Sequence, residues 1–170
     1  LAKMTVIDNM LLGAAEQKGE SLRNALLPSR WQKQEKQILK KAEDLLGRFK
    51  LSHMRDEYAA TLSGGQRKLL EMARALMSEP KLILLDEPMA GVNPVLVESL
   101  LVHIENLRDE GVSVLFIEHD MDAIMGISDW IVVLAEGQVI AEGTPSDVSK
   151  NPAVIDAYLG SAIAEELKDV

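Results

Sequence analysis

An alternation of short apolar strands and amphipathic helices after residue 61 constrains the fold more than any other feature. Residues 82–85 are all apolar, and residues 112–117 form a second, mostly apolar run. A helical pattern precedes the first run, and another begins at Pro94 and ends at Gly111. Alternating strands and helices favour a parallel sheet with right-handed crossovers, so the predicted class is α/β. All-apolar strands are typical of a sheet covered on both faces.

Two further patterns flank this region. Between residues 31 and 50, apolar side chains recur at helical spacing with Lys and Glu opposite, which predicts an amphipathic helix. Residues 130–135 and 138–141 flank Glu136-Gly137, which predicts a β-hairpin, and short helices follow it.

Composition excludes several classes of function. The chain has no cysteine, so disulfide scaffolds, thiolate metal sites and cysteine nucleophiles are excluded. Its apolar runs are far shorter than the about 20 residues of a membrane-spanning helix, and no charged-then-apolar leader is present, so we expect a cytoplasmic protein. The net charge is −9, and the acidic excess lies after residue 60, which argues against nucleic-acid binding.

The sequence Ser63-Gly64-Gly65-Gln66 is the sharpest candidate site. A serine at a helix N-cap followed by two glycines lets bare backbone N–H groups approach an anion, and the positive end of the helix favours phosphate. Taken alone, most Ser-Gly-Gly turns are simply helix caps.

Acidic residues and a histidine follow the two predicted strands. Asp86 and Glu87 end the first strand, at the sheet edge where ligands of α/β proteins bind. There Asp86 can hold Mg²⁺ through its water shell, and Glu87 can accept a proton from an attacking water. His119 follows the second strand and can hydrogen-bond a terminal phosphate. Each residue alone is more often structural or merely solvated.

Together, in this order and spacing, these motifs resemble the ATP-binding-cassette (ABC) ATPase family. Residues 62–66 match its signature motif, residues 82–87 its Walker B motif and His119 its switch histidine. Residues 90–93 stand where the family has its D-loop. Many members carry Asp where this chain has Asn93, which weakens any carboxylate role there but leaves an amide able to hydrogen-bond across a dimer.

The resemblance narrows further. Residues 90–94, 117–121, 125–129, 143–145 and 151–160 look most like the ATP-binding subunits of branched-chain amino-acid importers. Export ATPases for lipids share several of these residues and remain an alternative. A second alternative is a soluble ABC ATPase of DNA repair, but that class interrupts its domain with long coiled coils, and no sustained heptads occur here.

The family resemblance implies a P-loop NTPase core with an α-helical signature subdomain over residues 1–78. The remainder of the core, with the C-terminal hairpin and short helices, would span residues 79–170. It also implies a head-to-tail dimer whose ATP and Mg²⁺ lie between two subunits. One subunit would supply Asp86, Glu87 and His119, and the other would supply Ser63, Gly64, Gly65 and Gln66, with Asn93 nearby. The expected partners are a second ATPase subunit and transmembrane permease subunits at the inner face of the cell membrane, with no nucleic acid.

One family motif has no counterpart in the chain. No Gly-x-x-x-x-Gly-Lys-Ser/Thr stretch occurs in the 170 residues, and the first residue is Leu1. In this family the adenine-stacking aromatic and the Q-loop glutamine also precede the region that resembles residues 5–10. We therefore expect a core that lacks its N-terminal part and a 170-residue chain that does not hydrolyse ATP alone.

Overall fold

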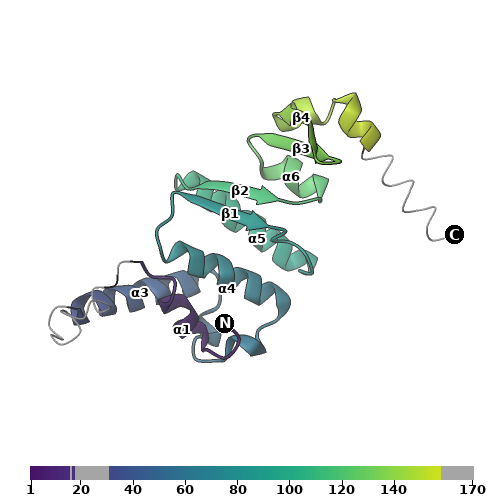
Figure 1. Ribbon diagram of the computed structural model, residues 1–170. Coiled ribbons are helices and arrows are strands. Elements are labelled where there is room, and N and C mark those ends of the chain that lie inside the picture. Colours follow the sequence, from purple (N-terminus) through teal and green to yellow (C-terminus); the bar gives the residue numbers. More distant parts are fainter. Residues whose placement is uncertain (16, 18–30, 158–170) are drawn as a thin grey trace. The chain divides into compact units, whose positions relative to one another are not determined.

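The computed structural model describes residues 1–15, 17 and 31–157, which fall into two compact units (Figure 1). The first unit is Leu1–Ile117 and the second is Glu118–Val170. Residues 158–160, at the end of the importer-like C-terminal stretch, lie outside the described residues. The predicted boundary near residue 78 falls inside the first unit and stays a prediction.

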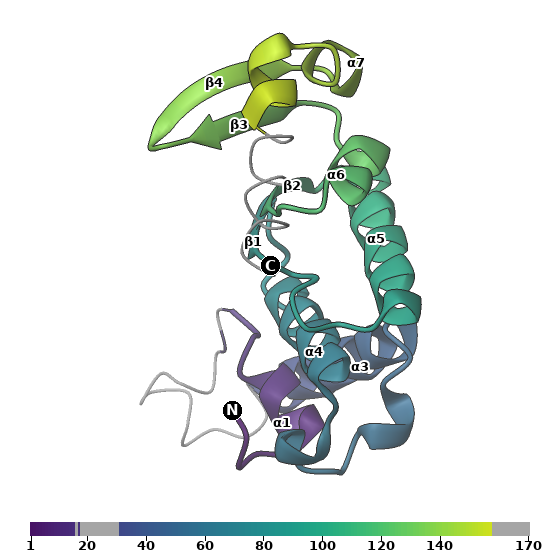
Figure 2. The same cartoon turned by 90° about the vertical axis from the view of Figure 1, so that its right-hand side faces the viewer.

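Among the described residues, three helices build the helical part of the first unit: α1 (Val6–Leu11), α3 (Gln32–Arg48) and α4 (Gly64–Leu76). Each packs against the other two, and Figure 2 shows them grouped together. The amphipathic helix predicted between residues 31 and 50 is confirmed as α3. Two 3₁₀ turns, η3 (Ser52–Met54) and η4 (Ala59–Thr61), connect α3 to α4. The core between these elements consists of fully or almost fully buried side chains, including Val6, Met10, Leu46, Phe49, Leu51, Leu69 and Ala73.

A parallel strand pair forms the other part of this unit. Strand β1 (Leu82–Asp86) pairs in parallel with β2 (Ser113–Ile117), and α5 (Pro94–Asp109) makes the crossover between them. The proline at the first turn of α5 costs no hydrogen bond, and Gly111 turns the chain after the helix with a φ of 85°. The predicted α/β alternation and parallel pairing are therefore confirmed.

The expectation that β1 is covered on both faces is wrong for the described residues. Ile83 is buried, and α5 packs against β2, but the alternate side chains of both strands point to solvent. Leu84 is 68% exposed and its register partner Leu115 is 58% exposed. The described chain supplies a helix to one face only, so period-two alternation exposes half of the apolar residues. We call Leu82, Leu84, Leu115 and Ile117 the open sheet face.

Helix α5 also carries a buried histidine. The ring of His103 is 7% exposed and stacks on Phe49 with the ring centroids 4.3 Å apart. Neither ring nitrogen has a hydrogen-bond partner. Burial lowers the pKa of His103, and the nearby charges of Arg48 and Lys50 lower it further. The neutral imidazole therefore acts as an aromatic spacer between α5 and the end of α3.

The second unit is built on the predicted β-hairpin, which is confirmed. Strands β3 (Ile131–Ala135) and β4 (Gln138–Gly143) are antiparallel, and Glu136 and Gly137 form the turn with φ values of 49° and 78°. Positive φ at both positions is the geometry of a type I′ turn, which matches the twist of the strands. Helices α6 (Met121–Ile127) and α7 (Pro145–Val148) accompany the hairpin, and residues 152–157 are also helical. The core consists of Ile131, Ala141, Val148 and Val154.

His103 makes the first unit sensitive to acid. The pKa of His103 is lowered in the folded state, so the unfolded chain binds the proton more tightly than the folded chain. The free energy of unfolding is therefore highest above the ordinary pKa of 6.5 and decreases as the pH falls below 6.5. Each pKa unit of difference contributes up to about 1.4 kcal/mol. In urea titrations, the unfolding free energy of His103→Leu should therefore decrease less between about pH 7.5 and about pH 5.5 than that of the wild type. His53→Gln, which changes an exposed histidine, is the control. Equal acid sensitivity in His103→Leu and the wild type would contradict the assignment.

Strand β2 pairs with β1 along one edge, and its other edge has no partner strand among the described residues. We expect this free edge and the exposed apolar side chains of the open sheet face to cause self-association of the 170-residue chain. Light scattering at micromolar concentration should detect oligomers or aggregates. The double variant Leu84→Lys, Leu115→Lys should reduce them. Leu134→Lys is the matched control, because Leu134 is also 68% exposed but lies on β3. A monodisperse wild-type monomer with a cooperative melt would show that this prediction is wrong.

Candidate functional site

Helix α4 begins as predicted, with Ser63 as its N-cap. The hydroxyl oxygen of Ser63 accepts a hydrogen bond from the backbone N–H of Gln66 at 3.2 Å. The side-chain carbonyl of Gln66 accepts the backbone N–H of Ser63 at 2.9 Å, which completes a capping box. The two side chains thus fix the entry of the chain into the helix.

This helix start keeps the chemistry that an anion site needs. The first N–H groups of a helix have no intrahelical acceptor, and here two of them belong to Gly64 and Gly65, which carry no side chain. Ser63 uses its oxygen as an acceptor, so its O–H can still donate. Ser63 and Gly64 are exposed. The arrangement fits a phosphate oxygen at the positive end of a 13-residue helix.

Gly65 is required for a second reason, which is packing inside the unit. It is buried, and a Cβ atom at this position would lie 2.5 Å from Cδ1 of Leu96 and 3.3 Å from Cγ1 of Val92. A Cβ at Gly64 would meet only the carbonyl oxygen of Gly91, at an ordinary 3.6 Å. The start of α4 therefore packs directly against residues 91–92 and the first turn of α5.

The two predicted acids lie at the carboxyl end of β1. Asp86 is the last residue of the strand, opposite Ile117 in the register, and both Asp86 and Glu87 are exposed. The backbone N–H of Glu87 donates to the carbonyl of Ile117 at 3.0 Å. Within the described residues, no group of three or more His, Cys, Asp or Glu side chains is arranged to hold a metal. One exposed carboxylate fits the way Mg²⁺ is commonly held, with most of its water shell retained.

Asn93 has a local role. Its side-chain oxygen accepts the backbone N–H of Leu96 at 3.0 Å and so caps α5. The amide N–H₂ group is the part of this side chain suited to donating to another group.

The structure places the predicted residues in two groups. Ser63, Gly64, Gly65, Gln66, Asp86, Glu87 and Asn93 all belong to the first unit. His119 belongs to the second unit, where its side chain is 81% exposed and its Nδ1 lies 3.8 Å from a carboxylate oxygen of Glu118.

Sequence reasoning missed one residue of this site. Lys68, in the second turn of α4, donates from its ammonium group to the backbone carbonyl of Glu87 at 3.2 Å. A lysine on an amphipathic helix normally lies on the solvated face, so the position of Lys68 in the sequence pattern did not predict a contact with Glu87. Only the packing of α4 beside the end of β1 reveals the contact.

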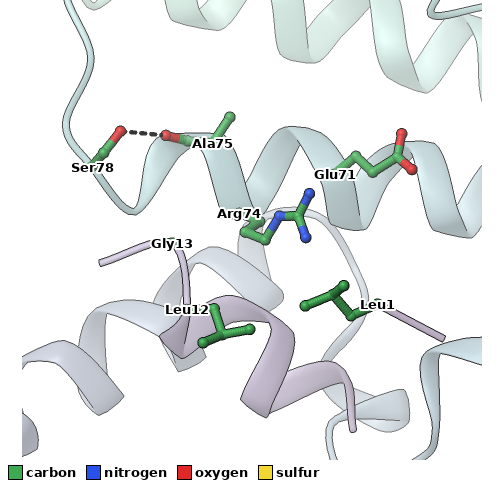
Figure 3. A pocket seen from close by; sticks show the side chains of 7 residues that line it. All are labelled: Leu1, Leu12, Gly13, Glu71, Arg74, Ala75 and Ser78. Atoms are coloured by element: carbon green, nitrogen blue, oxygen red, sulfur yellow. Dashed lines mark hydrogen bonds between the residues drawn. The ribbon is translucent and has the colours of Figure 1, made fainter. Parts of the chain in front are cut away.

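A shallow pocket of about 330 Å³ lies elsewhere, between α1 and α4 (Figure 3). At its edge a Cβ atom on Gly13 would meet the carbonyl oxygen of Arg74 at 2.4 Å, so the end of α1 approaches the backbone of α4 closely. None of the predicted site residues lines it. The lining residues are Leu1, Leu12, Gly13, Glu71, Arg74, Ala75 and Ser78.

Comparison with known proteins agrees with the motifs. Residues 2–90 match the model of the family described as ABC transporter. The chain belongs to the ABC transporter family. Residues 138–164 match a second model, described as branched-chain amino acid ATP-binding cassette transporter.

Relatives extend this similarity over nearly the whole chain. The chain is 47% identical over 165 residues to a probable branched-chain amino acid transport ATP-binding protein, LivG, of Archaeoglobus fulgidus, covering 97% of the chain and 63% of that protein. It is 38% identical to the high-affinity branched-chain amino acid transport ATP-binding protein BraF of Pseudomonas aeruginosa, over 94% of this chain and 64% of that protein. The chain thus spans less than two thirds of the length of these relatives.

A solved structure supports the fold. The ADP conformation of an ATP-binding cassette of an ABC transporter superposes with a TM-score of 0.75 at 41% identity, over 94% of this chain and 64% of that one. The fold is therefore that of the P-loop NTPase cassettes of ABC transporters, as predicted.

The packing role of Gly65 can be tested by a double-mutant cycle. Gly65→Ala should lower the unfolding free energy by about 1 kcal/mol or more, because Leu96 must leave its position. In a Leu96→Ala background the same change should be neutral or stabilising, since the contact is relieved and alanine favours helix. Urea unfolding measures both. Gly64→Ala is the matched control and should change the unfolding free energy only slightly. A Gly65→Ala cost that is unchanged by Leu96→Ala would contradict the packing role.

Proposed function

We propose that the complete protein is the ATP-hydrolysing subunit of an ABC importer for branched-chain amino acids. The observation that carries the proposal is the cassette arrangement itself, in which the glycine-rich start of α4 and the acidic end of β1 lie in one unit. The names of the relatives and the match of residues 138–164 support the choice of solute class.

In this proposal the protein works as a head-to-tail dimer with composite sites. Ser63, Gly64, Gly65 and Gln66 contact the nucleotide held by the partner subunit, through the donors at the start of α4. Asn93 hydrogen-bonds across the dimer. Residues 1–78 act as the helical subdomain, and residues 79–170 form part of the ATPase core.

The remaining residues act on the subunit's own nucleotide. Asp86 would hold Mg²⁺ through water, and this ion supplies charge neutralisation for phosphoryl transfer when bound. Glu87 accepts the proton of the attacking water, and His119 donates a hydrogen bond to the terminal phosphate. Positioning of this kind accounts for most of the catalysis in phosphoryl transfer.

Transport requires further subunits. None of the helices in the part of the chain that the structure describes is long and apolar enough to cross a membrane. We infer that transmembrane permease subunits bind the protein at the inner face of the cell membrane and carry the solute path.

The roles of the two acids are separable in the complete protein. Glu87→Gln should lower ATP turnover by about 10²–10⁴-fold while nucleotide binding persists, because the amide keeps the shape but cannot accept a proton. Asp86→Asn should instead raise the Mg²⁺ concentration needed for half-maximal turnover. Steady-state turnover and fluorescent-nucleotide binding measure these effects. Near-native turnover in Glu87→Gln, or identical behaviour of the two variants, would contradict the assignment.

The solute class has its own test. A strain lacking the complete protein should lose energy-dependent uptake of labelled leucine, isoleucine or valine, and the wild-type gene should restore it while Glu87→Gln should not. Normal uptake in the deletion strain would reject the importer proposal without affecting the assignment of ATP hydrolysis.

A further inference from the structure

The contact between Lys68 and Glu87 joins two motifs that are distant in sequence. Lys68 lies in the second turn of α4, the residue is half-buried, and its ammonium group makes a solvent-exposed hydrogen bond to the backbone carbonyl of Glu87 at 3.2 Å. A hydrogen bond from a charged donor is stronger than one between neutral groups. It therefore acts on the position of the Glu87 backbone.

The backbone of Glu87 adopts a conformation that requires stabilisation by neighbouring groups. Its φ is 43°, in the left-handed region that residues other than glycine rarely adopt, and it precedes Pro88, which further restricts it. Such conformations persist only where the surroundings over-determine them. Here the backbone N–H donates to Ile117 at 3.0 Å, and the carbonyl accepts from Ala90 at 3.2 Å as well as from Lys68.

We propose that Lys68 is a positioning residue that holds the Glu87 backbone in its left-handed conformation and thereby aims the carboxylate at the attacking water. The proposal rests on the proposed ATPase function. The contact that the structure shows is to the backbone carbonyl of Glu87, so we assign Lys68 a role that acts through Glu87.

The position of Lys68 on α4 gives this contact a second consequence. The same helix begins at Ser63 and is fixed there by its capping box. In the proposed dimer Ser63 lies at the partner's nucleotide, whereas Glu87 serves the subunit's own. A shift of α4 on nucleotide binding would thus be transmitted, over the first two turns of the helix, to the general base of the other site.

Steady-state kinetics of the complete protein test the proposal. Lys68→Met keeps the length of the side chain and removes its donor, and it should lower kcat about three- to tenfold with little change in KM for ATP. Lys68→Arg keeps a charged donor and should restore most of kcat. Lys41→Met is the matched control, because Lys41 also donates to a backbone carbonyl, that of Met77 at 3.0 Å, near the other end of α4. This control should leave kcat unchanged.

Hydrogen exchange followed by mass spectrometry gives a readout that does not require activity. In Lys68→Met the backbone amides of Glu87, Met89 and Ala90 should exchange faster than in the wild type, and in Lys68→Arg and Lys41→Met they should not. Unchanged exchange and unchanged kcat in Lys68→Met would overturn the proposal. So would an equal loss of kcat in Lys41→Met, or a failure of Lys68→Arg to restore it. If the wild type does not hydrolyse ATP, the proposed function fails, and the exchange data alone decide whether Lys68 holds Glu87.

Discussion

The close approach of α4 to the first turn of α5 is the contact on which the rest of the first unit depends. It exists because Gly65 has no side chain, since a Cβ would fall 2.5 Å from Leu96. The same approach brings the second turn of α4 beside the end of β1, so that Lys68 reaches Glu87. Gly65 is therefore needed for packing against the strand–helix crossover, and in the proposed function it also belongs to the start of α4 that meets the nucleotide.

The turn at the acidic end of β1 is stabilised in a backbone conformation that the local sequence disfavours. Glu87 has a positive φ and stands before a proline, which an isolated peptide would disfavour. Backbone bonds from β2 and from Ala90, together with Lys68, stabilise it. Strained residues of this kind cluster at functional sites, which agrees with the proposed role of the carboxylate.

The strand pair is stabilised from one side only. Helix α5 covers one face through residues such as Leu100 and Ile104, while the open sheet face leaves its leucines in solvent. His103 extends the covered side by stacking on Phe49 at the end of α3. The helical part and the strand pair are thus joined by aromatic packing as well as by the contact at Gly65.

Local signals in the sequence were enough to predict the element types, the start of α4 at Ser63 and the hairpin, because periodicity, caps and turn residues act over a few residues. The alternation of strands and helices predicted the parallel pairing, and the order of the motifs indicated the family. The sequence also predicted which residues carry chemistry, since the family motifs lie in short contiguous stretches. Four features follow only from the folded chain: the open sheet face, the packing that requires Gly65, the burial of His103 and the hydrogen bond from Lys68 to the carbonyl of Glu87. Each of these depends on a contact between segments distant in the sequence, and no local pattern specifies the distance between two elements.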